Sequence, residues 1–208
     1  MTRLLVATTN VNKVREIRQL LDSAHVELVT LGAWPGVAAP EETGKTFEEN
    51  ARAKAHYYAA ATGELTVAED SGLEIDALGG APGVESARFG GAETSYPEKF
   101  VLIHDALRAK GLATSPARFV CAVAVARAGR ILFETRGTVE GTIAPAPRGE
   151  GGFGYDPIFF YPPFGRTFGE AAREEKDRVS HRGKAFARLR GFLCNVPFAK
   201  APVEHQER

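Results

Sequence analysis

The sequence of 208 residues has only two cysteines, one methionine and one tryptophan, and its formal net charge is zero. Neither Cys121 nor Cys194 is near a second cysteine or a histidine at a metal-ligand spacing, so neither a disulfide framework nor a zinc site is indicated. No apolar run is long enough for a membrane span or a signal sequence, which favours a cytoplasmic protein without a membrane partner. The balance of 26 basic and 26 acidic residues argues against binding nucleic acid through overall charge.

What the chain does contain is typical of one globular domain, and we expect residues 1–208 to form a single domain with a frayed tail after Pro197. Apolar runs bounded by turn residues predict strands at 3–9, 26–31, 64–70 and 157–161, and a hairpin over 118–141 that turns near Ala128 and Gly129. Apolar residues at helical spacing and capping signals predict helices at 11–22, 46–62, 95–111, 170–180 and 183–194. This alternation predicts a mixed α/β fold, with a central sheet and helices on both faces.

The stretch TTNVNK at residues 8–13 follows the first predicted strand and leads into a helix. Free backbone N–H groups and the positive end of the helix dipole attract anions at such a junction. Thr8, Thr9 and Asn10 add short polar side chains, and Lys13 adds a mobile charge. The alternative is an ordinary turn in which Asn10 caps the helix.

The stretch AEDSG at residues 68–72 is expected to end another strand. Neighbouring strand residues point to opposite faces, so at most one of Glu69 and Asp70 should face a shared site. The sequence Asp-Ser-Gly also suits a plain turn. The loop EETG at residues 41–44 adds further acids, and two carboxylates from separate segments could hold Mg²⁺.

Two more regions, at residues 149–160 and 173–185, contain candidate site residues. GGFGYDPIFF at residues 151–160 surrounds its aromatic rings with glycines, which suits either a tight turn or a pocket wall. GEGGFG, at residues 149–154, matches the dinucleotide-binding pattern but lacks the strand before it and the helix after it. In REEKDRVSHRGKA, at residues 173–185, Ser180 can cap the last helix and bring His181 and Arg182 to its N-terminus, although a charged surface helix is the simpler interpretation.

Taken together, these stretches resemble the inosine/xanthosine triphosphate pyrophosphatase family. The matching segments are ATTNVNKVRE, EETGKTFEENARAKA, EDSGLEIDALGGAPGVESARF, GGFGYDPIFF and EEKDRVSHRGKA. The resemblance implies a long mixed sheet flanked by helices, with a cleft between two lobes. It also implies a homodimer that uses Mg²⁺ to hydrolyse ITP, dITP and XTP to the monophosphate and pyrophosphate.

The resemblance also assigns roles by position. Residues 8–13 (Thr8, Thr9, Asn10, Val11, Asn12 and Lys13) would bind phosphate, and Lys54 would reach the triphosphate. Asp70 would be the general base or a metal ligand together with Glu41, and Ser71 would contact the substrate. The base and the sugar would be held by Phe153, Gly154, Tyr155 and Asp156. The residues that close on the nucleotide would be Lys176, His181 and Arg182. The family usually has a small residue where Thr9 stands and an aspartate where Glu69 stands.

Three other functions remain alternatives. A pyrophosphatase of the Maf-like type would share the general architecture but prefer other bases. A catalytically silent nucleotide sensor would bind without turnover, although carboxylates facing an anion are unfavourable there unless a metal lies between them. An RNA-binding module is disfavoured by the neutral charge.

Overall fold

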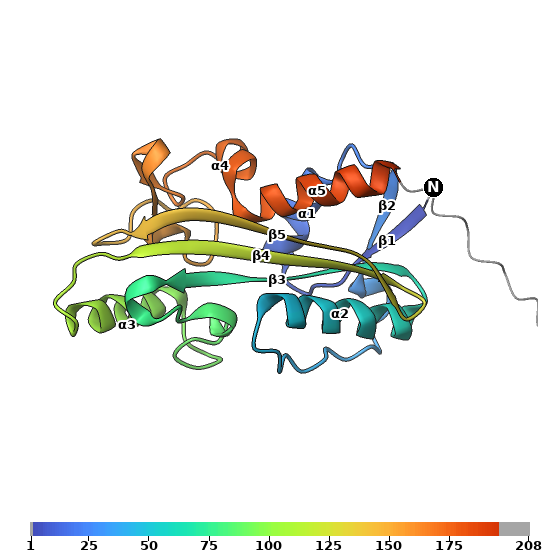
Figure 1. The fold of residues 1–208 in the computed structure, drawn as a ribbon, viewed down its shortest axis with the longest axis horizontal. Coiled ribbons are helices and arrows are strands. Elements are labelled where there is room, and N and C mark those ends of the chain that lie inside the picture. The colour runs from blue at the N-terminus through green and yellow to red at the C-terminus, as the bar shows by residue number, and fades with distance from the viewer. Residues whose placement is uncertain (1, 196–208) are drawn as a thin grey trace, which may run out of the picture.

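The computed structural model describes residues 2–195, so the predicted frayed tail lies outside the described residues. Its centre is one seven-stranded sheet in the order β2-β1-β3-β4-β5-β6-β7 (Figure 1). β1 pairs in parallel with β2 and β3, and the remaining pairs are antiparallel. The predicted α/β class with a mixed sheet is therefore confirmed, whereas the two lobes stay a prediction. The strands are β1 (Thr2–Val6), β2 (Val26–Thr30), β3 (Leu65–Ile75), β4 (Pro116–Arg127), β5 (Arg130–Ile143), β6 (Phe159–Tyr161) and β7 (Arg166–Thr167).

Helices cover both faces of this sheet, as the sequence predicts (Figure 1). One face carries α1 and α5, whose apolar side chains share one buried cluster, and α4 lies beside them. The opposite face carries α2 and α3. None of these described helices is long and apolar enough to cross a membrane. Their bounds are α1 (Val11–Leu20), α2 (Phe47–Thr62), α3 (Tyr96–Arg108), α4 (Arg173–Val179) and α5 (His181–Asn195).

Local chemistry sets the ends of several elements. The side-chain oxygen of Thr46 accepts a hydrogen bond from the Glu49 amide at 3.1 Å, which starts α2. Gly63 ends that helix with a φ of 72°, a left-handed conformation that suits glycine. The hairpin of β4 and β5 turns at Ala128 and Gly129, both with positive φ. These three predicted boundaries are confirmed.

The third strand differs from the sequence prediction. It does not end at Asp70 but continues through Ser71 and Gly72 to Ile75. Each of these residues pairs with β4, and Leu73 and Ile75 are completely buried. The long ladder and the buried apolar side chains outweigh the local turn preference of Asp-Ser-Gly.

The extra length of β3 leaves one of its edges open. β1 pairs with β3 only at Leu65–Val67. Beyond Val67, the described residues place no further strand on that edge, apart from an isolated bridge between Glu74 and Pro82. Both side chains and backbone of β3 can therefore contribute to a cavity at this edge.

Candidate functional site

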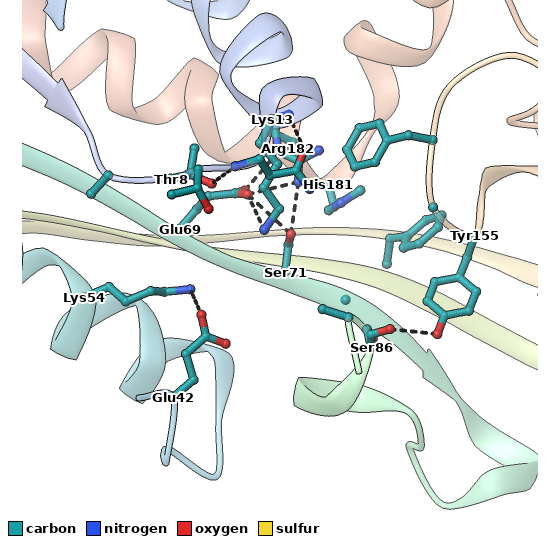
Figure 2. Close-up of a pocket in the computed structure, with 18 of the residues that line it drawn as sticks. Thr8, Lys13, Glu42, Lys54, Glu69, Ser71, Ser86, Tyr155, His181 and Arg182 are labelled. Carbon is teal, nitrogen blue, oxygen red and sulfur yellow. Dashed lines mark hydrogen bonds and ion pairs between the residues drawn. The ribbon is translucent and has the colours of Figure 1, made fainter. Parts of the chain in front are cut away.

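A cavity of about 290 Å³ lies along the open edge of β3 (Figure 2). The start of α1, the start of α5 and the loop before β6 contribute to its wall. Among the predicted site residues, Val11, Asn12, Asp70 and Glu41 are not part of this lining. The predicted residues that do line the cavity are Thr8, Thr9, Asn10, Lys13, Lys54, Ser71, Phe153, Gly154, Tyr155, Asp156, Lys176, His181 and Arg182.

At the start of α1, the amides are largely engaged by neighbouring side chains. The Oδ1 of Asn10 accepts hydrogen bonds from the amides of Asn12 at 3.0 Å and Lys13 at 3.2 Å. The Oγ1 of Thr8 accepts one from the Asn10 amide at 3.2 Å. Asn10 is thus an ordinary helix cap, the alternative that the sequence left open. Val11 is 70% exposed and does not line the cavity, whereas Lys13 lines it and is the cation of this segment.

Two cations converge on Glu69, which is almost completely buried. The Nε and Nη2 of Arg182 donate to its two oxygens at 2.9 and 3.1 Å, and the Nζ of Lys13 lies 2.9 Å from Oε1 (Figure 2). Burial opposes the ionisation of Glu69, but the charges of Arg182 and Lys13 hold its pKa well below the ordinary value. Glu69 is therefore ionised at neutral pH, on the face of the sheet that carries α1 and α5.

Further charges extend this contact into one chain of alternating sign. The Nη1 of Arg182 donates to Glu16 at 2.6 Å, and Lys176 donates to Glu16 at 3.2 Å and to Asp156 at 2.6 Å. We call Lys13, Glu69, Arg182, Glu16, Lys176 and Asp156 the ion chain. Arg182 also donates to the Ser71 hydroxyl at 3.0 Å. Within residues 2–195, these contacts engage four of the five N–H groups of Arg182, so Arg182 acts mainly within the protein.

The glycine-rich loop before β6 is shaped by Asp156. The carboxylate of Asp156 accepts a hydrogen bond from the Phe153 amide at 2.8 Å. Gly152 has a φ of 71°, and a Cβ there would lie 2.0 Å from Oδ2 of Asp156. The glycine therefore makes room for the acid. The Phe153 ring has the Lys176 ammonium 5.0 Å and the Arg182 guanidinium carbon 5.5 Å from its centroid, so it forms an aromatic wall beside two cations.

His181 is the first residue of α5, and the predicted cap is confirmed because Ser180 Oγ accepts from the Gly183 amide at 2.9 Å. A Cβ at Gly137 of β5 would lie 2.0 Å from the His181 carbonyl oxygen, so this glycine lets α5 approach the sheet. The imidazole stacks on Phe119 with 4.8 Å between centroids. Burial lowers the pKa of His181 well below its ordinary value, so the ring is neutral. Its Nδ1 is buried and has no hydrogen-bond partner within the described residues.

On the opposite face of β3, one lysine joins two acids. The Nζ of Lys54 donates to Glu42 at 2.9 Å and to Asp70 at 3.1 Å, and Asn50 donates to Asp70 at 3.0 Å. Burial raises the pKa of Asp70 despite the neighbouring Lys54. The predicted metal ligand Glu41 is exposed and away from the cavity, whereas its neighbour Glu42 lines it. The metal-binding role of Glu41 stays a prediction, and Glu42 is the neighbouring acid that the fold brings to the cavity.

Other groups around the cavity could not all be predicted from the sequence. Glu16 lies three residues after Lys13 on α1, and this spacing places the two side chains on neighbouring parts of the helix surface, a signal that could have found it. Ser86, Tyr58 and Tyr96 had no such signal, because only the tertiary fold brings them to the cavity. Within residues 2–195, no group of three or more acidic, histidine or cysteine side chains is arranged to hold a metal.

Fold and site together define a mixed α/β protein whose cavity is equipped for an anionic ligand with a flat ring: cations at α1 and α2, and an aromatic wall before β6. The chain belongs to the Ham1 family, whose model matches residues 4–192.

Individual relatives cover almost the whole chain. A dITP/XTP pyrophosphatase of Gloeobacter violaceus is 50% identical over 186 residues, which are 89% of this chain and 91% of the relative. A dITP/XTP pyrophosphatase of an Exiguobacterium species is 45% identical over 198 residues, covering 95% and 99%. Among solved structures, a HAM1 protein from Coxiella burnetii superimposes with a TM-score of 0.88 at 37% identity, covering 94% of this chain and all of that one.

Proposed function

We propose that this protein hydrolyses the non-canonical purine nucleoside triphosphates ITP, dITP and XTP to the monophosphate and pyrophosphate, and so clears them from the nucleotide pool. The names of relatives that are 45% and 50% identical over nearly the full chain support this substrate class. The observation that carries the proposal is the pair of acids, Glu42 and Asp70, bridged by the Lys54 ammonium beside a cavity that is also lined by Lys13, Lys176 and Arg182. A module that only binds phosphate gains nothing from two such acids.

The acid pair also fits Mg²⁺. Two carboxylates from separate segments already enclose one cation, the Lys54 ammonium, and Mg²⁺ prefers oxygen ligands of which a protein supplies only one or two. Glu42 and Asp70 would hold the ion, with Glu42 in the role first assigned to Glu41. When bound, Mg²⁺ supplies positive charge that neutralises phosphate oxygens and the leaving pyrophosphate.

The chain's own residues account for the remaining steps. Lys13 and Lys54 line the cavity and would bind the triphosphate, and Thr8 and Thr9, which also line it, would add hydroxyl groups. Asp70 would orient or deprotonate the water that attacks the α-phosphorus, because its carboxylate lies 3.1 Å from Lys54, one of the lysines expected to bind the triphosphate. No covalent intermediate is needed, since positioning and charge stabilisation dominate this class of reaction.

The other end of the cavity would hold the base. The Phe153 ring offers a stacking surface that accepts every purine, so discrimination has to come from polar groups at the ring's edge. The free Nδ1 of His181 and the remaining N–H of Arg182 are the candidates, because both residues line the cavity and each keeps an uncommitted nitrogen group.

Product analysis tests the proposal directly. The protein is incubated with ITP, dITP, XTP, GTP or ATP, with Mg²⁺ or with a chelator, and NMP, NDP, phosphate and pyrophosphate are resolved. We expect NMP and pyrophosphate from ITP, dITP and XTP only with Mg²⁺, and nearly no turnover by Asp70→Asn. NDP and phosphate would indicate a different phosphohydrolase, binding without products would indicate a sensor, and preference for other bases would favour the Maf-like type.

Two further expectations also remain proposals. The resemblance implies a homodimer, which light scattering of the purified protein tests by mass. The lack of a long apolar run in the sequence favours a cytoplasmic location, which fractionation of the source cells tests.

A further inference from the structure

Tyr96, the first residue of α3, forms part of the cavity wall although no sequence motif pointed to it. It lines the cavity together with Ala87 and Gly154, and its ring packs edge-on against Tyr155 with 5.3 Å between centroids. A Cβ built on Gly154 would lie 3.6 Å from the Tyr96 hydroxyl oxygen. The hydroxyl group therefore lies directly beside the loop that carries Phe153.

The position of this ring is fixed by its surroundings. Glu98 accepts hydrogen bonds from the Ser95 amide at 2.7 Å and the Ser95 hydroxyl at 2.6 Å, which fastens the first turn of α3. The ammonium of Lys99 lies 4.8 Å from the Tyr96 ring centroid and donates to the Ala87 carbonyl at 2.6 Å. Lys99 is only 2% exposed, and its two contacts connect the Tyr96 ring to Ala87 in the neighbouring cavity wall.

The hydroxyl group of Tyr96 differs from that of Tyr155. Tyr155 donates to the Ser86 carbonyl at 2.8 Å, whereas the Tyr96 hydroxyl makes no hydrogen bond within residues 2–195. Burial, and then the charge of Asp156, raise the pKa of Tyr96, so its hydroxyl stays protonated and can donate. Tyr96 is 36% exposed, which leaves the group accessible to a ligand.

The middle part of a bound nucleotide, between its base and its phosphates, would lie near the Tyr96 hydroxyl. Under the proposed function, the base lies by Phe153 and the phosphates lie by Lys13 and Lys54, so the sugar spans the interval. Gly154 follows Phe153 directly, and Tyr96 approaches it from α3, on the face of the sheet opposite α5. The sugar is the part of the nucleotide that offers hydroxyl groups on this side.

We propose that the Tyr96 hydroxyl donates a hydrogen bond to a hydroxyl group of the substrate's sugar and so contributes to the recognition of that sugar. The inference rests on the proposed function, because it needs the purine nucleotide to occupy the cavity in that orientation. It adds a specificity-determining residue from α3, an element that otherwise contributes nothing to the chemistry.

The test compares Tyr96→Phe with the wild type on ITP, dITP and 3′-deoxyinosine triphosphate. The variant keeps the ring and its contacts with Tyr155 and Lys99. Loss of one neutral hydrogen bond should lower kcat/KM for ITP by about 3- to 10-fold. For the analogue that lacks the contacted hydroxyl, the variant should equal the wild type within about twofold. Tyr57→Phe is the matched control, since Tyr57 is similarly exposed at 39% and lies outside the cavity.

An equal loss on all three substrates, or no loss on ITP, would overturn the inference while leaving the pyrophosphatase activity intact. A wild type that releases no pyrophosphate from any of them would instead refute the proposed function. Titration calorimetry with inosine monophosphate and its 2′-deoxy and 3′-deoxy forms needs no turnover and examines Tyr96 by itself. There the affinity loss of Tyr96→Phe should again vanish for one deoxy form, and a uniform loss would count against the contact.

Discussion

Replacing Glu69 by glutamine should make the protein unfold at a much lower urea concentration. The amide keeps the shape of the side chain but puts an NH₂ donor where an oxygen now accepts from Arg182, Lys13 or Cys121. Removing one partner of a buried ion pair costs about 3–5 kcal/mol. With an m-value of about 3 kcal/mol/M in urea, the unfolding midpoint should fall by about 1 to 1.7 M.

Asp70→Asn is the matched control on the next residue of the strand. Burial already raises the pKa of Asp70, so its surroundings disfavour the charge that the amide removes. The free energy of unfolding should therefore change by no more than about 1 kcal/mol, in contrast to Glu69→Gln. Circular dichroism during urea titration measures both midpoints.

The two acids should also respond to pH with opposite signs. The pKa of Glu69 is lower in the folded than in the unfolded protein, so its stabilisation is complete above the unfolded value of about 4.3 and is lost as the pH falls further. The difference in the free energy of unfolding between Glu69→Gln and the wild type should therefore become smaller as the pH falls. The pKa of Asp70 is higher in the folded than in the unfolded protein, where it is about 3.9, so ionisation of Asp70 destabilises the fold. The stability of Asp70→Asn should therefore increase relative to that of the wild type as the pH rises above this value. A Glu69→Gln midpoint equal to that of the wild type at pH 7 would refute the reasoning.

Three further outcomes are expected. Gly137→Ala should destabilise the protein by about 1–3 kcal/mol, because its Cβ would meet the His181 carbonyl, whereas Gly191→Ala in open space on α5 should not; equal midpoints in thermal unfolding would contradict this. The imidazole NMR signals of His181 should not titrate between pH 8 and 5 in the folded protein, and a transition near 6.5 would show that the ring is not held neutral. Lys54→Met should leave Glu42 and Asp70 without their shared cation, so Mg²⁺ should raise its melting temperature more than that of the wild type; an equal rise would argue against a metal between these acids.

Sequence alone predicted those parts of the fold whose cause is local. Thr46 and Gly63 set the ends of α2, and Ser180 caps α5, because in each case the deciding contact lies within a few residues along the chain. The turn at Ala128 and Gly129 belongs to the same group, since the two flanking strands pair directly.

Contacts between distant segments explain the parts that could not be predicted. Asp-Ser-Gly at residues 70–72 looked like a turn, but β4, about fifty residues later in the chain, extends the strand through it. In the loop before α2, no periodicity distinguishes Glu41 from Glu42. Only the tertiary fold shows that Glu42 lines the cavity and Glu41 does not. Arg182 lies 166 residues from Glu16, so neither local sequence indicates that the two side chains form an ion pair.

The ion chain has a consequence for how the substrate preference of this protein can change. Within it, Lys176 pairs with two buried acids, and so does Arg182. A substitution of either residue therefore removes a group from the cavity and also leaves a buried acid without one of its counter-charges. A variant selected for a new base at these positions would need a second, compensating substitution to remain folded. The Tyr96 hydroxyl, in contrast, has no hydrogen-bond partner in the part of the chain that the structure describes. Directed evolution from this sequence should therefore accumulate its first specificity changes around α3, and changes within the ion chain should arise in pairs.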